Sequence, residues 1–260
     1  MRFDYYSATL PAAQSHCLAT INHHFSGHMV EDRPVKPYAH GLRHHETGFR
    51  LYWGGHNPLP YFVASGEHSQ RAADCIRDVY PLHRVTRADV AEDFDEAGGF
   101  DRVVALIEPI ARQAGVEVCF MGDPDPSKKT GRTMYYGSTQ SDVRICLYEK
   151  GLHERSQGNL AASETWCRLE LRVRPRKQRK GLCASMSPAD MWGLSRWSSQ
   201  VSASVLASVC PFQPDPSLRL STADQAVGHM LRQYAGSIRR FIDEYGEEQF
   251  FRRVKDAINA

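Results

Sequence analysis

The 260-residue sequence predicts an α+β fold, with a central, mostly antiparallel sheet, flanking helices and a helical C-terminal region. Three observations support this prediction. Short runs of aromatic and β-branched residues alternate with Gly, Asn and Pro turn signals in the first half. Two segments with apolar residues at helical spacing lie between strand candidates. From about residue 187 onward, the pattern is helical throughout.

In the first half, strands are expected at residues 3–10, 36–45, 48–55 and 61–66. A helix is expected over residues 68–80, because Ala72, Ala73 and Ile76 recur at helical spacing. A further strand is expected over residues 83–94. An amphipathic helix is expected over residues 100–116, with Gly115 as its end signal. A polar loop follows at residues 122–131.

Three more strands are expected at residues 133–137, 141–150 and 165–173, and the short GSTQ connection between the first two is typical of a hairpin. Residues 153–164 and 175–181 are expected to be loops. A Ser-Pro start predicts a helix over residues 187–209. Beyond a Pro-rich break, helices are expected at 222–246 and 247–260. We therefore expect a sheet domain over residues 1–185 and a helical region over residues 186–260.

The composition indicates an ordinary globular protein, with 42% hydrophobic and 24% charged residues. No apolar run is long enough for a spanning helix, and the N-terminus lacks the apolar segment of a secretory signal. The seven cysteines are odd in number and widely spaced, which predicts reduced thiols. We therefore expect a cytoplasmic protein without a membrane partner.

The charge is unevenly distributed along the chain. Between Lys128 and Lys180 there are 13 Lys or Arg and 5 Asp or Glu, a local charge of +8, whereas the whole chain carries +2. The remainder therefore carries about −6. Such a distribution is typical of a basic patch that faces a polyanion, although a basic solvated face has the same composition.

Three expected strands each gather charged side chains or a tyrosine on one face, because successive side chains of a strand alternate. Salt bridges on the solvent face of an antiparallel sheet would also explain this pattern. The three faces hold, in chain order, Arg87, Asp89 and Asp93; Arg144, Tyr148 and Lys150; and Trp166, Arg168, Glu170 and Arg172.

If these faces converge, they combine the parts that cleavage of a phosphodiester bond needs. A tyrosine hydroxyl can act as a nucleophile. Carboxylates are the hard oxygen ligands that Mg²⁺ prefers, usually one or two at a time. Arginine binds phosphate through its planar fork of donors.

The chain resembles the replication initiation factor family of rolling-circle initiators, which occur on plasmids, filamentous phages and prophages. The resemblance covers roughly residues 45–175, and its motifs are specific as a set rather than singly. The segments that carry it are R-A-D-V-A-E-D (Arg87–Asp93), T-M-Y-Y-G-S-T-Q-S (Thr133–Ser141), R-I-C-L-Y-E-K-G (Arg144–Gly151) and W-C-R-L-E-L (Trp166–Leu171).

The resemblance implies a relaxase-like nicking endonuclease that forms a 5′-phosphotyrosine and leaves a 3′-OH primer. Tyr148 matches the position of the nucleophile, and Lys150 would stabilise its developing charge. Asp89 and Glu170, with Asp93 as a third candidate, would hold Mg²⁺ or Mn²⁺. His153 is a further candidate ligand. The side chains implied to hold DNA phosphates are Arg87, Arg144, Arg168, Arg172, Arg174, Arg176 and Lys177.

Arg176 and Lys177 belong to the basic run PRKQRKG, and Arg174 directly precedes it; this segment is either a phosphate-tracking loop or a solvated loop. Tyr135 and Tyr136 are rival nucleophiles. The implied partners are origin DNA, single-stranded or cruciform, a host helicase and polymerase, and a second copy of the chain in a homodimer.

Two other functions compete with nicking. A non-catalytic DNA-binding regulator of a replicon would use the same basic sheet. A tyrosine recombinase would need an Arg…His-x-x-Arg…Tyr order with the tyrosine near the C-terminus, whereas Tyr148 lies mid-chain and upstream of the arginine-rich strand, so this class is disfavoured.

Overall fold

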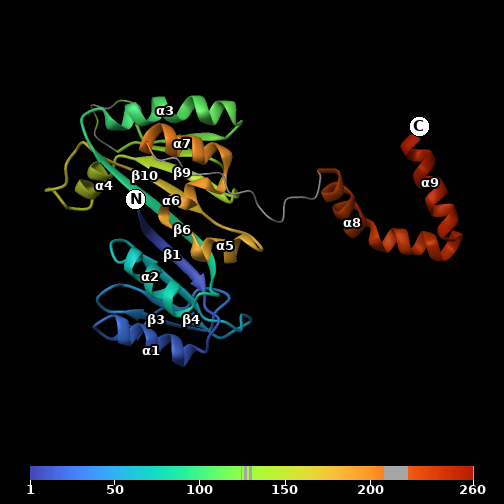
Figure 1. Cartoon of the computed structure of the whole chain (residues 1–260), viewed down its shortest axis with the longest axis horizontal. Coiled ribbons are helices and arrows are strands. Elements are labelled where there is room, and N and C mark those ends of the chain that lie inside the picture. The colour runs from blue at the N-terminus through green and yellow to red at the C-terminus, as the bar shows by residue number, and fades with distance from the viewer. Residues whose placement is uncertain (124, 126–127, 129–130, 208–221, 260) are drawn as a thin grey trace. The chain divides into compact units, whose positions relative to one another are not determined.

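The computed structural model describes residues 1–123, 125, 128, 131–207 and 222–259 (Figure 1). The chain divides into two compact units, Met1–Pro214 and Asp215–Ala260. The first unit contains the sheet and seven α-helices among its described residues, and the second contains two helices. The expected boundary near residue 185 differs from this division, because the helices between residues 188 and 206 pack with the sheet unit.

Within the described residues, ten antiparallel-paired strands form one sheet in the order β2-β3-β4-β5-β1-β6-β10-β9-β8-β7. The expected fold class is therefore confirmed. The strands are β1 (Arg2–Thr9), β2 (Met29–Glu31), β3 (His40–His44), β4 (Arg50–Trp53), β5 (Tyr61–Ser65), β6 (Arg84–Asp95), β7 (Val118–Met121), β8 (Thr133–Tyr136), β9 (Val143–Tyr148) and β10 (Trp166–Val173).

Helices cover one face of the sheet, which we call the closed face; the other is the open face. The helices of the first unit are α1 (Gln14–His24), α2 (Ser69–Val79), α3 (Gly99–Gln113), α4 (Lys150–Ser156), α5 (Arg179–Ser185), α6 (Pro188–Met191) and α7 (Arg196–Leu206), with a 3-10 turn at Trp192–Leu194. Helices α2, α3, α5 and α6 contact the central strands, and α7 packs on α3.

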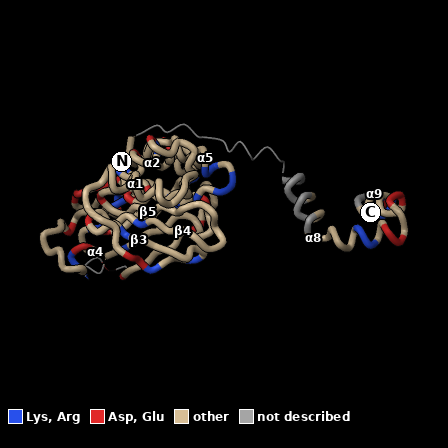
Figure 2. Tube along the Cα trace, turned by 90° about the horizontal axis from the view of Figure 1, so that it is seen from below, with Lys and Arg blue, Asp and Glu red and all other residues tan. Residues whose placement is uncertain are grey.

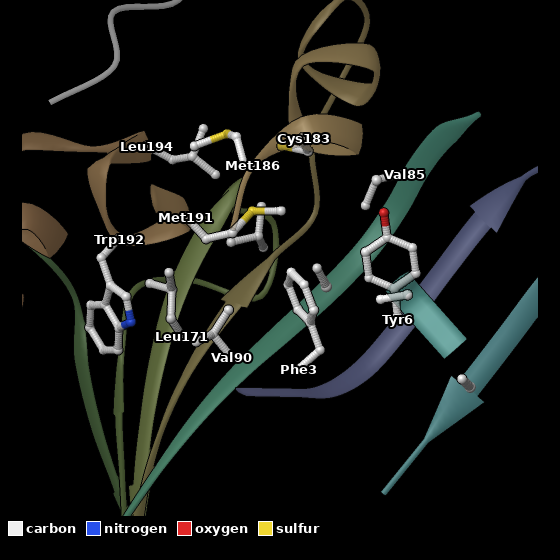
Figure 3. Packing of buried hydrophobic residues seen from close by; sticks show 14 of the residues in the cluster. Phe3, Tyr6, Val85, Val90, Leu171, Cys183, Met186, Met191, Trp192 and Leu194 are labelled. Carbon is white, nitrogen blue, oxygen red and sulfur yellow. The ribbon is translucent and has the colours of Figure 1, made fainter. Parts of the chain in front are cut away.

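The closed face is apolar because alternate residues of each central strand point toward these helices. Leu171 pairs with Val90 on one side and Ile145 on the other, and all three are fully buried. Figure 3 shows Phe3, Val90 and Leu171 on the strands facing Met191 and Trp192. Each such side chain stabilises the fold by about 1.5–3 kcal/mol through burial. This packing holds the central strands in register beneath the open face.

Local signals explain where the helices begin. Ser187 caps α6 through its hydroxyl, and Asp190 accepts a hydrogen bond from the backbone of Ser187, so the two residues form a capping box. The backbone of Gly98 has a φ of 71° at the start of α3, a conformation that favours glycine.

Several elements differ from the sequence-based expectations. Helix α1 and strands β2 and β7 lie in segments for which no such element was expected. Helix α5 begins within a segment expected to be a loop, and α4 extends into another. These elements are short or have few apolar residues, so their periodicity is weak. The strand expected to reach Lys150 ends at Tyr148, and Lys150 instead begins α4.

The second unit consists of α8 (Thr222–Tyr245) and α9 (Glu247–Asn259), joined at Gly246, whose φ is 84°. Both helices were expected. The apolar stripe expected on α8 is largely exposed in this structure, with Val227, Leu231 and Tyr234 each about half accessible. Among the described residues, no helix combines the length and apolar character needed to cross a membrane. The six described cysteines are free thiols, and Cys210 lies outside the described residues.

Candidate functional site

The three polar strand faces come together on the open face, because β6, β10 and β9 are neighbours in the sheet. The register aligns them in cross-strand rows. These rows are Asp93–Arg168–Tyr148, Ala91–Glu170–Cys146 and Asp89–Arg172–Arg144. The sequence-predicted nucleophile, carboxylates and arginines thus occupy one continuous surface.

Tyr148 is bound to Glu170 at the centre of this surface. The Tyr148 hydroxyl donates a hydrogen bond of 2.7 Å to Oε1 of Glu170, whose residue is only 4% exposed. Burial and the charge of Glu170 raise the pKa of Tyr148 well above its ordinary value. The phenol is therefore neutral at physiological pH, and a carboxylate oxygen is in place to accept its proton.

A hollow of about 260 Å³ lies beside Tyr148. Its size suits a small group such as a phosphodiester, and its wall combines hydroxyl and cationic side chains. The hollow brings the candidates Tyr148, Lys150 and His153 together around one space. It is lined by Thr133, Tyr135, Cys146, Tyr148, Lys150, His153 and Arg172.

Lys150 reaches the hollow from the first turn of α4 rather than from strand β9. Its ammonium forms an ion pair of 2.5 Å with Glu154, one helical turn away, and lies 5.8 Å from the centre of the Trp166 ring. The expectation that Lys150 shares a strand face with Tyr148 is therefore wrong in its geometry, because the strand ends before it. The two side chains nevertheless line the same hollow.

The two rival tyrosines lie on opposite faces of β8. Tyr135 pairs with Cys146 and lines the hollow, so it stays a rival to Tyr148. Tyr136 is fully buried on the closed face, where burial raises its pKa above the ordinary value. Tyr136 therefore has no access to a nucleic acid bound on the open face.

Arg172 lies between two carboxylates. Its Nη2 donates to Oε2 of Glu170 at 2.8 Å, and its Nε is 4.0 Å from Oδ2 of Asp89. Arg87 also binds Asp89, with 2.9 Å from Nε to Oδ1. Each of these carboxylates is thus neutralised by at least one arginine, as buried charges require.

Asp93 belongs to a separate ion-pair group at the neighbouring end of the same face. It accepts hydrogen bonds from Nε of Arg168 at 2.7 Å, from Nε1 of Trp166 at 2.9 Å and from Nη2 of Arg2 at 2.9 Å. Burial opposes the ionisation of Asp93, but the bonds from Arg168 and Trp166 outweigh it and lower the pKa of Asp93. Arg168 also donates to Asp4 at 2.9 Å.

These contacts do not fit a divalent cation held by Asp89, Glu170 and Asp93. Asp93 is bound by two arginines and an indole, and Arg172 lies between the other two carboxylates. Among the described residues, no group of three or more His, Cys, Asp or Glu is arranged to hold a metal ion. Binding of Mg²⁺ by the pair Asp89 and Glu170 would require the arginines to move.

The predicted DNA-binding arginines fall into two groups. Arg87, Arg168 and Arg172 are engaged by carboxylates on the open face. Arg144 instead lies over the Tyr135 ring, 4.1 Å from its centre, and its buried Nε has no hydrogen-bond partner within the described part of the chain. Arg144 therefore differs from the other three arginines in having no carboxylate partner within the part of the chain that the structure describes.

The basic loop after β10 is exposed, and Figure 2 shows its lysines and arginines as a run of blue beside the label α5. Arg174 donates to the backbone oxygen of Thr139 at 3.1 Å, and Arg176 forms an ion pair of 2.9 Å with Asp142. Both contacts join the loop to the turn between β8 and β9. Lys177, with a φ of 47°, is exposed at the tip.

Sequence reasoning missed the contribution of β1 to this surface. Asp4 binds Arg168, Arg2 binds Asp93, and Arg87 lies over the Tyr5 ring at 4.4 Å. The strand itself was expected, but its position between β5 and β6 was not. Its polar residues between Phe3 and Ala8 are the signal that could have identified an open face.

Comparison with known proteins supports the resemblance. The sequence model described as replication initiation factor matches residues 83–182, a segment that contains all four motif segments identified from the sequence. The suspected resemblance to this family is thereby confirmed over that segment. A search of curated proteins gave no significant match.

The fold is also found in a solved structure, that of a rolling circle replication initiator protein from Geobacillus stearothermophilus. The two chains are 14% identical, with a TM-score of 0.52, and the match covers 84% of this chain and 88% of the other. At this identity the match establishes a shared fold.

Proposed function

We propose that this chain, whose residues 83–182 match the replication initiation factor family, is a rolling-circle replication initiator that nicks one strand of its origin DNA. The observation that carries the proposal is the hydrogen bond of 2.7 Å from Tyr148 to Glu170 beside a cationic hollow. It couples a nucleophile to a base on a surface rich in phosphate-binding side chains.

In the proposed reaction, Oη of Tyr148 attacks the scissile phosphorus while Glu170 accepts the phenolic proton. The bond from phosphorus to the 3′ oxygen breaks, and the 3′ oxygen takes a proton from water. The products are a 5′-phosphotyrosine and a free 3′-OH. The raised pKa of Tyr148 makes such a base necessary, because little phenolate exists at neutral pH.

Positive side chains would stabilise the charge that develops on the phosphate oxygens. Arg172 and Lys150 line the hollow, and Arg144 lies over the Tyr135 ring at its edge. Fixed cationic donors lower the free energy of such a transition state because they are already oriented toward the developing charge. Arg174, Arg176 and Lys177 would hold flanking phosphates on the exposed loop.

A requirement for Mg²⁺ or Mn²⁺ stays part of the proposal, on the basis of the family resemblance alone. When bound, a divalent cation would polarise the scissile phosphate. The arrangement of Asp89, Glu170 and Asp93 gives this part no support, so no step is assigned to a metal here. Origin DNA, in single-stranded or cruciform form, is the proposed substrate. A host helicase, a polymerase and a second copy of the chain are the proposed partners.

A second candidate function is DNA binding without catalysis, as a regulator of the replicon. Its support is that all three candidate carboxylates are already bound to arginines and that Tyr148 is held as a neutral phenol. Such a network would give a rigid basic surface whether or not it cleaves DNA.

The deciding experiment is a suicide-cleavage assay with labelled single-stranded origin DNA, run with Mg²⁺, with Mn²⁺ and with EDTA. We expect a covalent adduct on a denaturing gel with the wild type and none with Tyr148→Phe. Tyr136→Phe is the matched control, because its buried hydroxyl has no partner among the described residues and should be dispensable.

Other outcomes of this assay separate the identity of the nucleophile, the metal requirement and the choice between nickase and regulator. An adduct that persists in Tyr148→Phe and disappears in Tyr135→Phe would move the nucleophile to Tyr135. An adduct that EDTA does not affect would refute the metal requirement. Origin binding by the wild type without any adduct would favour the regulator.

A further inference from the structure

Three tyrosines from separate segments stack on the part of the sheet that the proposed reaction does not use. Tyr38 precedes β3, Tyr52 is on β4 and Tyr61 is on β5. The rings of Tyr38 and Tyr61 are nearly parallel, 5.7 Å apart at an angle of 5°. Tyr52 stacks with both, at 6.3 Å from Tyr38 and 6.2 Å from Tyr61. Asn57 donates a hydrogen bond of 2.8 Å to the Tyr38 hydroxyl and so holds that ring in place.

This tyrosine stack lies on the open face, in continuity with the candidate site. Tyr52 pairs with Tyr61, and the register of β5 with β1 places Tyr61 on the same side as Tyr5. Burial and the charge of the neighbouring Tyr61 raise the pKa of Tyr5 to about 12. Arg87 lies over the Tyr5 ring and also binds Asp89. A row of rings therefore leads from β4 to the ion pairs beside Tyr148.

Basic side chains border the tyrosine stack. Arg43 and Arg50 are cross-strand partners on β3 and β4, on the same face as Tyr52. Arg50 forms an ion pair of 3.3 Å with Asp32, whereas Arg43 has none within the described residues. Arg33 and Lys36 are exposed on the loop that leads to Tyr38. Stacked rings among cations are the arrangement by which proteins hold single-stranded nucleic acid.

We propose that Tyr38 and Tyr61, with Arg43, form a second contact site that stacks the bases of single-stranded DNA flanking the nick. This inference rests on the proposed function. It adds a contact to the DNA bases, whereas the contacts proposed at the reaction centre are to phosphates. The partly exposed ring of Tyr38 supplies a stacking surface. The ring of Tyr52, a residue that is only 4% exposed, stacks against Tyr38.

The span between the two sites suits one continuous strand. Strands β9 and β5 are separated by β10, β6 and β1, four inter-strand steps of about 4.8 Å each, or roughly 19 Å across the sheet. Along the strands, Tyr148 aligns with Asp93 of β6 and Tyr61 aligns with Arg84, nine residues away, which adds an offset of about 30 Å at about 3.3 Å per residue. The two offsets combine to roughly 35 Å, which about ten stacked nucleotides cover at about 3.4 Å each. Single-strand sites of this kind usually hold about 4–16 nucleotides. A strand cleaved at Tyr148 therefore reaches the tyrosine stack within an ordinary footprint.

The test is a fluorescence anisotropy titration of the full chain with two labelled probes of about a dozen nucleotides, oligo-dT and an abasic strand of the same length. Stacking predicts that Tyr38→Ala weakens binding to oligo-dT about tenfold and leaves the abasic strand unaffected. Tyr38→Phe, which keeps the ring, is the matched control and should bind as the wild type does. Arg43→Gln should weaken both probes and reduce the salt dependence of binding by about one counterion.

Equal affinity of Tyr38→Ala and the wild type for oligo-dT would overturn the inference and leave the three rings with a packing role. An equal loss on the abasic strand would overturn it too, since it would indicate a damaged surface rather than lost stacking. Thermal unfolding of each variant shows whether the fold is intact. The adduct assay is separate, so a wild type that binds oligo-dT through Tyr38 yet forms no adduct would refute nicking and keep the tyrosine stack.

Discussion

Glu170 is the residue on which the proposed chemistry depends most. It accepts the proton-bearing hydroxyl of Tyr148 on Oε1 and the guanidinium of Arg172 on Oε2. The arginine pairs with one carboxylate oxygen in this buried position, and the other oxygen faces the phenol, where it is placed to accept the phenolic proton. One side chain thus links the nucleophile to the cationic wall of the hollow.

Glu170→Gln tests this link, because the amide keeps the shape of the side chain and removes its basicity. We expect the rate of adduct formation to fall by about 10²–10⁴-fold, the usual contribution of a general base. Binding of single-stranded DNA should persist, since the change removes a negative charge from the surface. Single-turnover adduct formation measures the first, and anisotropy measures the second. A rate within a few-fold of the wild type would show that Glu170 is not the base.

At the scale of elements, the β6–β10 pair is the scaffold of the site. Its apolar side packs against helices. On its polar side, Arg168 of β10 donates hydrogen bonds to Asp93 of β6 and to Asp4 of β1. Arg168 is only 5% exposed, so loss of one carboxylate partner leaves a buried cation with fewer bonds. This ion-pair group therefore contributes to stability as well as to the surface charge.

Asp93→Asn should lower the free energy of unfolding by about 2 kcal/mol at pH 7. This loss is smaller than for a fully buried ion pair, because Asp93 is partly exposed and Asp4 still binds Arg168. The pKa of Asp93 is lower in the folded chain than its ordinary value, so its stabilisation is present above about pH 4 and is lost as the pH falls through the folded pKa. Urea unfolding from pH 7 to about pH 3 measures this. Glu117→Gln, at an exposed position, is the control. A difference that stays constant at acid pH would contradict the assignment to Asp93.

At the scale of the whole molecule, the sheet unit and the C-terminal helices are separate units. Every residue of the main hydrophobic core that the structure describes lies before residue 207. Helices α8 and α9 instead leave apolar side chains such as Leu231 and Phe251 accessible. The core of the first unit is therefore complete without the second.

A chain that ends at residue 207 should unfold cooperatively at about the same temperature as the sheet unit of the full chain, because no described core residue is removed. Circular dichroism and calorimetry of both chains provide the measurement. Loss of the cooperative transition in the shorter chain would show that the C-terminal helices are needed for the fold.

Part of the site could be predicted from local pattern. Alternation along β9 and β10 correctly placed Arg144 with Tyr148 and Glu170 with Arg172, because the two-residue period of a strand is a local property. The motifs around Tyr148 and Glu170 were enough to indicate the family that the sequence model matches. The position of Lys150 was not predictable in this way, since the chain turns into α4 after Tyr148.

The sequence by itself determined the α+β class, the order of most elements and the side chains that share a strand face, because these follow from propensity and periodicity within a few residues. Only the tertiary structure decided which strands are neighbours. The pairing of β6 with β10 brings Asp93 to Arg168, 75 residues later in the chain, and Arg172 to Asp89. The insertion of β1 between β5 and β6 joined the tyrosine stack to the candidate site. Such contacts depend on burial of the closed face of the whole sheet, which no short stretch of the chain encodes.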